Sequence, residues 1–176
     1  LDLAYVPIVE SAFRTEALSR AKAKGFWQLM RPTAVEQGLK YDWYIDERSS
    51  PEKSTVAAVK YLKYLHGKFN GDWHLALASY NGGPGTVQRA VKRKGKADFW
   101  PLAEGRQYLP RETREYVPMV LASIVLARNP EYYGFAIAPA ALPATDTVTL
   151  PGPVDLRRVA EWAGVPIDEV QRLNPE

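Results

Sequence analysis

The chain has 176 residues, of which 46% are hydrophobic and 24% charged, with a formal net charge of +3; these are the proportions of a folded globular protein and exclude an intrinsically disordered chain. Every uncharged apolar stretch is shorter than the roughly 18 residues that cross a bilayer, so we expect no membrane-spanning helix. The absence of cysteine excludes disulfides and thiolate chemistry, and two histidines make a histidine-rich metal site or a Ser-His-Asp triad a poor hypothesis.

The first informative segment, Tyr5 to Phe13, holds a single carboxylate, Glu10, among apolar side chains. On a helix or at its end, such a glutamate loses hydration, and desolvation raises its pKa. A general acid that works near neutral pH needs a pKa raised in this way. The same pattern also fits a buried glutamate that pairs with an arginine for structural reasons.

The next segment, Gly25-Phe-Trp-Gln28-Leu-Met30, places an amide and a thioether in an aromatic stretch that begins with glycine. Amides and aromatic faces around a carboxylate are typical of sugar recognition, because flat rings stack on sugars and amides supply fixed donors and acceptors. Trp27 equally fits an ordinary core residue.

Helical signals then dominate the chain. Ser50 followed by Pro51 is typical of a helix start, and apolar residues recur at helical spacing as far as Gly67. We expect the inward face of this helix to carry Val56, Val59, Tyr61, Leu62 and Leu65.

Asp72 is expected to cap a second helix, which buries Trp73, Leu75, Ala76, Leu77 and Tyr80. This helix must end at Asn81-Gly-Gly-Pro-Gly85, a cluster of turn-forming residues. The phenol of Tyr80 and the amide of Asn81 therefore lie at the end of a buried helix, where the chain turns sharply. The sequence Tyr-Asn-Gly is also common in ordinary turns.

Two more helices are predicted. Thr86 opens a basic amphipathic helix with Val87, Ala90 and Val91 inward, whose Lys92-Arg93-Lys94 run is interpreted as a solvated face. A long apolar helix covers about 113–127 and ends near Asn129-Pro130. Because alternating strand patterns are scarce, residues 1–135, which we call the body, are predicted to be all-α.

Composition divides the chain into three parts. Residues 1–135 carry 20 Lys and Arg against 14 Asp and Glu, and residues 136–176 carry 3 against 6. The Pro/Ala-rich stretch 136–145 is interpreted as a linker. Residues 146–176 form a C-terminal extension, with a possible strand at 147–150, a short helix between Asp155 and Gly164, and a second that holds Ile167, Val170 and Leu173.

Four ordered motifs in residues 1–135 resemble one family: Glu10-Ser11; Gly25-Phe-Trp-Gln28-Leu-Met30; Tyr80-Asn81-Gly-Gly-Pro-Gly85; and Tyr108-Leu-Pro-Arg-Glu112-Thr-Arg-Glu-Tyr116-Val-Pro118. The chain resembles the catalytic domain of the lytic transglycosylases of the soluble type, within the goose-type lysozyme superfamily. The resemblance implies an α-helical, lysozyme-like fold with a groove for peptidoglycan glycan strands, and a small C-terminal appendage.

By that resemblance, Glu10 is the single catalytic acid and base, and Tyr80 lies beside it to orient it. The resemblance assigns substrate binding to Ser19, Gln28, Met30, Tyr80, Asn81, Glu112 and Tyr116, the last two on the opposite side of the groove. No metal or cofactor is implied.

The implied reaction cleaves the bond between N-acetylmuramic acid and N-acetylglucosamine and forms a 1,6-anhydromuramoyl product. Asp42, Asp46 and Glu47 occupy a polar turn that we expect to be exposed, and we assign them no role, although Asp46 or Glu47 could be the base of a true hydrolase. A muramidase of the same superfamily and an inactive glycan-binding protein are the alternatives.

Three departures from the family pattern stand in this sequence. Arg31 follows Met30 where the family has proline, Thr15 replaces a proline five residues after the acid, and Gly82 replaces an alanine. None removes a catalytic group; Arg31 adds a cation to the approach of the groove.

The C-terminal segment that ends Leu-Asn-Pro resembles the helical part of a LysM peptidoglycan-binding module; a structural extension that packs on the body is the alternative. We expect a monomer in the bacterial cell envelope that binds peptidoglycan and no nucleic acid, since the charge of the body is modest. Because the sequence begins at Leu1, we interpret it as a fragment without its targeting signal.

Overall fold

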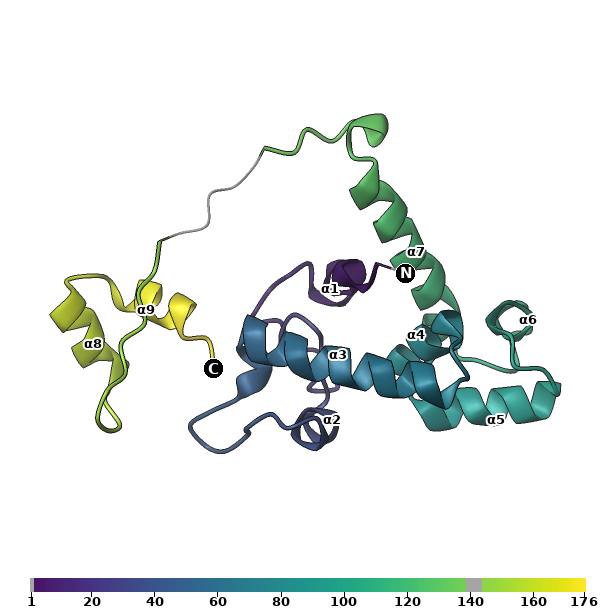
Figure 1. Ribbon diagram of the computed structural model, residues 1–176, viewed down its shortest axis with the longest axis horizontal. Coiled ribbons are helices and arrows are strands. Elements are labelled where there is room, and N and C mark those ends of the chain that lie inside the picture. The colour runs from purple at the N-terminus through teal and green to yellow at the C-terminus, as the bar shows by residue number, and fades with distance from the viewer. Residues whose placement is uncertain (1, 139–143) are drawn as a thin grey trace.

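The computed structural model describes residues 2–138 and 144–176, and it is built from helices (Figure 1). The elements in chain order are η1 (Leu3–Tyr5), α1 (Val6–Ser11), α2 (Arg31–Glu36), η2 (Glu47–Ser49), α3 (Pro51–Lys68), α4 (Trp73–Gly82), α5 (Pro84–Lys94), α6 (Phe99–Glu104), α7 (Arg111–Arg128), η3 (Glu131–Tyr133), α8 (Leu156–Ala163) and α9 (Ile167–Leu173). Strand pairing in the described part of the chain is limited to three isolated bridges. The prediction of an all-α fold is confirmed.

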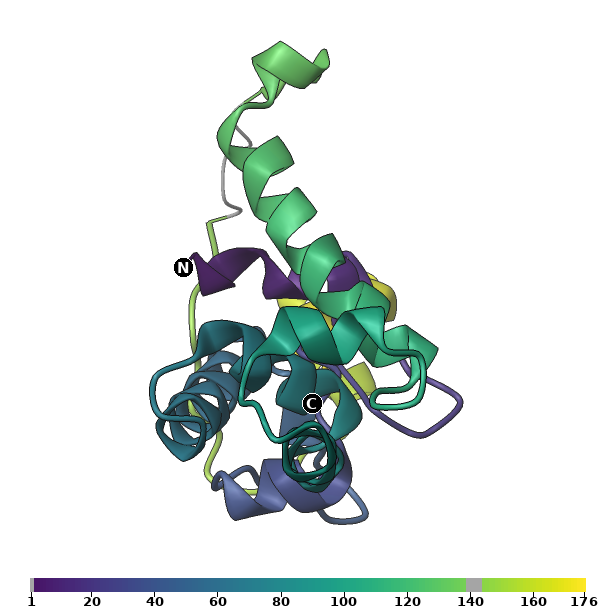
Figure 2. The same cartoon turned by 90° about the vertical axis from the view of Figure 1, so that its right-hand side faces the viewer.

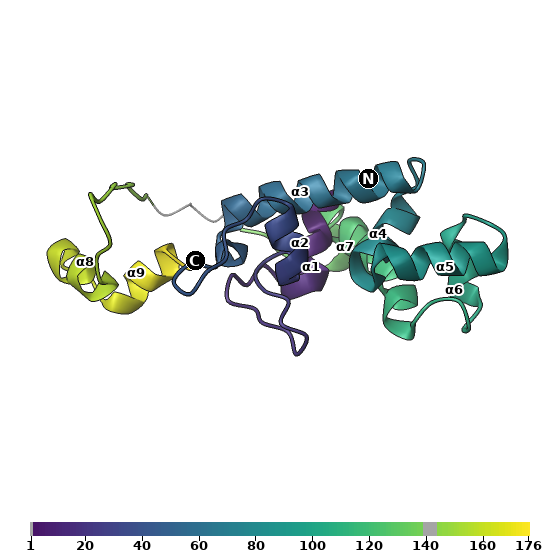
Figure 3. The ribbon, with the colours of Figure 1, turned by 90° about the horizontal axis from the view of Figure 1, so that it is seen from below.

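Helix α4 forms the centre of the body. Its residues 75–79 are all buried, so the helix is apolar on every side rather than on one stripe. It packs against α3, α5 and α7, which enclose it (Figures 1 and 3). The site residues at the end of α4 are therefore carried by the most enclosed helix of the body.

The packing of α3 differs in part from the sequence prediction. Leu62 and Leu65 are buried as expected, but Val56 and Val59 are exposed. The buried face at the start of α3 carries Ser54, Ala57 and Ala58 instead. The buried side chains at the start of α3 are therefore small, and the larger buried ones, Leu62 and Leu65, follow in its second half.

The predicted helix caps are confirmed at three places. The side chains of Ser50, Asp72 and Asp155 accept hydrogen bonds from backbone N–H groups in the first turns of α3, α4 and α8. The predicted start of α5 at Thr86 is wrong by two residues. Gly83, at φ 81°, ends α4 and directly precedes α5, and Pro84 begins the new helix because its fixed φ suits the first turn.

Helix α7, near the C-terminal end of the body, contacts both α4 and the N-terminal helix α1. Its C-terminal half extends beyond the other helices (Figure 2). Thr113, Tyr116, Val117 and Val120 form its buried face, at helical spacing. This packing brings the first turns of α7 next to α1.

The C-terminal segment contains α8 and α9, which pack on each other through Ala160 and Val170. The predicted strand at 147–150 is wrong: these residues are exposed and pair with no strand in the described ranges.

Part of the predicted linker, residues 139–143, lies outside the described residues, and the division at 136–145 stays a prediction. Within the described ranges, no helix is long and apolar enough to cross a membrane.

Candidate active site

Glu10 lies one residue before the end of the short helix α1. Val6 and Pro7, at the start of this helix, are buried. After the helix, Ala12 and Phe13 both adopt left-handed backbone conformations, with φ of 51° and 59°. The hydroxyl of Ser11 donates a 2.9 Å hydrogen bond to the carbonyl of Phe26. This bond ties the end of α1, and with it Glu10, to the Gly25–Met30 segment.

The Gly25–Met30 segment is held from several sides. The indole Nε1 of Trp27 donates to Oγ1 of Thr55 on α3 at 2.8 Å, and the hydroxyl of Tyr80 on α4 donates to the carbonyl of Trp27 at 2.7 Å. Gly25, at φ 80°, lies against the backbone of Arg48, where an added Cβ would come within 1.9 Å of the carbonyl oxygen. Only glycine fits this position, which explains the glycine at the start of the motif.

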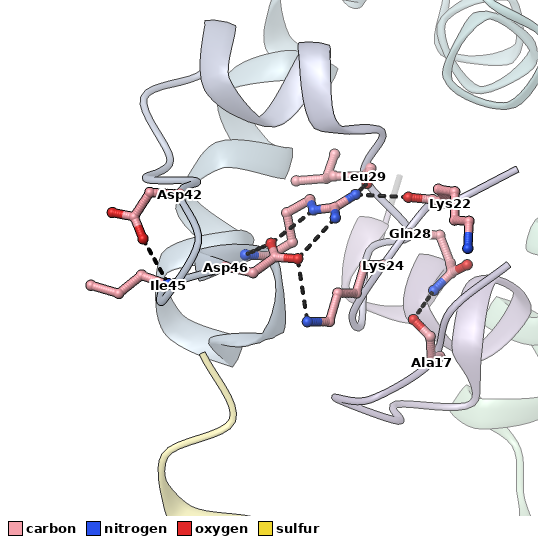
Figure 4. Close-up of polar contacts among 9 residues, drawn as sticks. Ala17, Lys22, Lys24, Gln28, Leu29, Asp42, Ile45 and Asp46 are labelled. Carbon is pink, nitrogen blue, oxygen red and sulfur yellow. Dashed lines mark hydrogen bonds and ion pairs between the residues drawn. The ribbon is translucent and has the colours of Figure 1, made fainter. Parts of the chain in front are cut away.

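Gln28 adopts φ 47° and turns its amide back onto its own loop. Its Nε2 donates to the carbonyls of Ala17, at 3.0 Å, and Gly25, at 2.9 Å (Figure 4). Because both amide hydrogens are committed to the protein, the free hydrogen-bonding atom of Gln28 is the acceptor Oε1.

The end of α4 meets the first turn of α7. Oδ1 of Asn81 accepts a 2.9 Å hydrogen bond from Thr113, and its Nδ2 donates to Oε1 of Glu112 at 3.3 Å. Gly82 lies directly against the side chain of Thr113. The orientation of the Asn81 amide is thus set by two neighbouring residues of α7.

These segments surround a cavity of about 490 Å³. All eight residues predicted for the site line it: Glu10, Ser19, Gln28, Met30, Tyr80, Asn81, Glu112 and Tyr116. Five lining residues were missed by the sequence analysis, namely Val9, Arg20, Ala21, Ala23 and Met119. Met119 follows Tyr116 by three residues on α7, so helical periodicity could have identified it; Arg20 and its neighbours lie between motifs and carried no such signal.

The carboxyl group of Glu10 has a pKa raised to about 7, chiefly because burial disfavours its charged form. The hydrogen bond from Tyr116 lowers the pKa, and the nearby negative charge of Glu112 raises it further. Glu10 makes no ion pair with an arginine within residues 2–138 and 144–176. The alternative of a structural Glu–Arg pair therefore has no support.

The two cavity tyrosines direct their hydroxyl groups to different partners. The hydroxyl of Tyr116, not that of Tyr80, donates the hydrogen bond to Oε1 of Glu10. Tyr80 lines the same cavity, but its hydroxyl donates to the carbonyl of Trp27. Tyr80 thus shares the cavity with Glu10, as expected, while its hydroxyl is bonded to the backbone of the Gly25–Met30 segment; its role in orienting Glu10 stays a prediction.

The polar turn near residue 45 lies outside the cavity lining. Asp42 is exposed, as predicted, and its side chain accepts hydrogen bonds from the backbone of Tyr44 and Ile45. Asp46 and Glu47 are half-buried instead. Asp46 forms ion pairs with Lys24 (Figure 4) and Arg48, and Glu47 forms one with Lys53. Both carboxylates are thus engaged in structural contacts.

In the described part of the chain, no group of three or more His, Asp or Glu side chains is placed to hold a metal ion.

An α-helical body in which a partly buried glutamate with a pKa of about 7 shares a cavity with two tyrosines is the kind of site that general acid catalysis requires. Residues 2–103 match the family model described as "Transglycosylase SLT domain", and the chain belongs to this family. Residues 144–176 match a second model, "Lytic transglycosylase MltD, LysM-like domain".

Individual relatives agree with this assignment. The chain is 38% identical over 184 aligned residues to membrane-bound lytic murein transglycosylase D of Escherichia coli K12, covering 99% of this chain and 38% of that protein. It is 37% identical over 103 residues to the peptidoglycan transglycosylase gp16 of phage T7, covering 57% of this chain and 8% of that protein. The crystal structure of the 70 kDa soluble lytic transglycosylase of Escherichia coli superposes with a TM-score of 0.62 at 26% identity, covering 77% of this chain and 22% of that one. The lysozyme-like fold is thereby confirmed, and the chain spans well under half the length of these relatives.

Proposed function

We propose that this protein is a peptidoglycan lytic transglycosylase that uses Glu10 as its single acid and base. The observation that carries the proposal is the Glu10 carboxyl group, which lines a polar-aromatic cavity with a pKa of about 7 and accepts a hydrogen bond from Tyr116. A carboxyl group with this pKa holds its proton in a large fraction of molecules near neutral pH, as a general acid must. Two relatives are named as a murein and a peptidoglycan transglycosylase, which supports the same substrate here.

In the first step, protonated Glu10 donates its proton to the glycosidic oxygen between N-acetylmuramic acid and N-acetylglucosamine. The bond from the muramoyl C1 to that oxygen breaks, and the N-acetylglucosamine leaves as an alcohol. The carbonyl oxygen of the muramoyl 2-acetamido group attacks C1 and takes up the developing positive charge. Because the substrate supplies this nucleophile, no second carboxylate of the protein is needed.

In the second step, the Glu10 carboxylate removes the proton from the muramoyl C6 hydroxyl. The C6 oxygen attacks C1, the acetamido oxygen is released from C1, and a 1,6-anhydro ring closes. Glu10 ends protonated, as it began, and no water is consumed. An internal hydroxyl held near C1 competes well with water because its effective concentration is high.

The remaining cavity residues are proposed to hold the sugars and their substituents. Ser19 can donate its hydroxyl proton, because its Oγ already accepts a hydrogen bond from the backbone of Ala23. Gln28 offers Oε1 as an acceptor, since its amide hydrogens are engaged. Met30, 43% exposed, offers an apolar surface to a sugar face. Asn81 and Glu112 contact each other and act as one polar unit.

We propose that the protein acts as a monomer. We further propose that the protein works in the cell envelope outside the cytoplasm, where peptidoglycan lies. The relative with the matching C-terminal segment is named as membrane-bound, which supports this location.

Product analysis of digested peptidoglycan tests the proposal. We expect the wild-type protein to release muropeptides that end in 1,6-anhydromuramic acid, detected by mass spectrometry. Glu10→Gln should abolish this release and retain binding to the strands, whereas Glu16→Gln, on an exposed side chain, should behave as wild type. Unchanged release by Glu10→Gln would show that another group is the acid.

The muramidase alternative has one structural observation in its favour. Glu112 is a second carboxylate that lines the cavity, and a hydrolase could use it as a base. Products with a reducing muramic acid end, without anhydro sugars, would establish that reading and overturn the transglycosylase proposal. Strand binding without any product from the wild-type protein would establish the glycan-binding alternative.

A further inference from the structure

A tight turn, residues 19–22, forms part of the cavity lining through Ser19, Arg20 and Ala21. The backbone N–H of Lys22 donates to the carbonyl of Ser19 at 3.0 Å, and the N–H of Ser19 donates to the carbonyl of Ala23 at 2.9 Å. The N–H of Ala23 in turn donates to Oγ of Ser19 at 3.0 Å. Three hydrogen bonds within five residues fix the backbone from which the Arg20 side chain extends.

Arg48, a buried arginine that does not line the cavity, anchors this turn; its partners Lys22, Leu29 and Asp46 are labelled in Figure 4. Nη1 of Arg48 donates to the carbonyls of Lys22, at 2.8 Å, and Leu29, at 3.1 Å. The same guanidinium donates from Nε and Nη2 to the two carboxylate oxygens of Asp46. The turn is thereby held at a set position relative to the Gly25–Met30 segment, so Arg20 is presented on a rigid support.

Arg20 is the one cationic residue in the cavity lining of the described chain, and the other charged lining residues are Glu10 and Glu112. Its side chain takes part in none of the ion pairs formed by residues 2–138 and 144–176. The carboxylate of Glu112, and that of Glu10 when it is ionised, repel an anionic ligand unless a cation offsets them. A guanidinium presents a planar set of donors that matches a carboxylate in two-point contact.

We propose that Arg20 is a specificity residue that binds a carboxylate on the muramoyl part of the substrate, an inference that rests on the proposed function. Two sources carry this group: the stem peptide, and the lactyl substituent once the peptide has been removed. A neutral strand of N-acetylglucosamine carries neither. Arg20 therefore selects strands that contain muramic acid over neutral amino-sugar polymers.

Lys22 provides a matched control. It lies two residues from Arg20 on the same turn, is exposed, and does not line the cavity. Arg48 holds its backbone carbonyl rather than its side chain. Lys22→Gln thus removes the same charge as Arg20→Gln from the same turn and leaves the cavity lining intact.

The experiment compares wild type, Arg20→Gln and Lys22→Gln on peptide-bearing strands and on denuded strands with free lactyl carboxylates. Affinity for a neutral N-acetylglucosamine oligosaccharide is measured by calorimetry. We expect Arg20→Gln to lower kcat/KM roughly three- to tenfold on at least one carboxylate-bearing strand, mainly through KM, with unchanged affinity for the neutral oligosaccharide. High salt should reduce this difference because it screens exposed charges.

A loss confined to peptide-bearing strands would place the carboxylate on the peptide, and a loss confined to denuded strands would place it on the lactyl group. An equal loss with the neutral oligosaccharide, an equal loss with Lys22→Gln, or no loss at all would overturn the inference. A failure of the proposed function is separate: the wild-type protein would then yield no anhydro product, while the effect of Arg20→Gln would still be measured as affinity for the strands.

Discussion

Tyr116 on α7 donates a 2.5 Å hydrogen bond to Oε1 of Glu10, which lies 106 residues earlier on α1. The hydrogen bond stabilises the charged form of Glu10, while burial and Glu112 stabilise the protonated form. The pKa of about 7 is the balance of these opposing effects. The contributions of Tyr116 and Glu112 to this pKa can each be removed by one substitution, with a predictable sign.

Tyr116→Phe removes the hydrogen bond that lowers the pKa of Glu10. The pKa should rise, so the loss of kcat/KM at alkaline pH should begin at a higher pH than in wild type. Because the carboxyl group also loses its orienting partner, kcat should fall about tenfold or more. A pH profile of kcat/KM checks both effects. Tyr64→Phe, on an exposed side chain of α3, should change neither, and an unshifted profile for Tyr116→Phe would contradict the proposed balance.

Glu112→Gln removes the negative charge that raises the pKa of Glu10. The alkaline limb should therefore move to lower pH, opposite in sign to the effect of Tyr116→Phe. We expect anhydro products to continue to form at a pH below this limb. Complete loss of activity at every pH would instead assign Glu112 a catalytic role, as the muramidase alternative requires.

Glu10→Gln should stabilise the protein at alkaline pH. The folded-state pKa of about 7 lies above the ordinary glutamate value of 4.5, so the folded protein binds this proton more tightly than the unfolded chain does. Stability is therefore lost as the pH rises between these two values, and the ionised Glu10 costs up to about 3 kcal/mol above pH 7. The difference in the free energy of unfolding between Glu10→Gln and wild type should therefore favour the variant more at pH 8 than at pH 4.5.

Urea denaturation at the two pH values measures this difference. The exposed Glu16→Gln serves as control, and its difference from wild type should not grow with pH in this way. A pH-independent effect of Glu10→Gln would show that the buried carboxyl group does not carry this cost.

Gly82→Ala should destabilise the protein by about 1–3 kcal/mol, because the added Cβ would lie 2.5 Å from Oγ1 and 3.0 Å from Cγ2 of Thr113. The collision also disturbs the hydrogen bond from Thr113 to Asn81, so activity should fall in addition. Thermal denaturation checks the stability effect. Gly67→Ala on α3 is the matched control: its added Cβ meets nothing within 4 Å, and a helical alanine should stabilise by about 0.5–1 kcal/mol. Equal behaviour of the two variants would refute the close approach of Gly82 and Thr113.

Local features of the chain were readable from the sequence because their causes are local. Ser50, Asp72 and Asp155 cap helices through backbone groups two or three residues away, and the predictions there are confirmed. Boundaries were less secure. The start of α5 was placed at Thr86 because the glycines before it were interpreted as a turn, whereas one glycine is enough to separate α4 from α5.

The sequence by itself determined the all-α class, the order of the motifs and the one glutamate embedded in apolar residues. Only the tertiary structure decided which hydroxyl meets that glutamate, because packing of α7 on α1 brings Tyr116 to Glu10, whereas Tyr80 on α4 donates to the backbone of Trp27. It likewise decided that Arg20 shares a cavity with Glu10 and Glu112. Hydrogen bonds and charge contacts act over a few ångströms in space, and a motif records only the spacing along the chain.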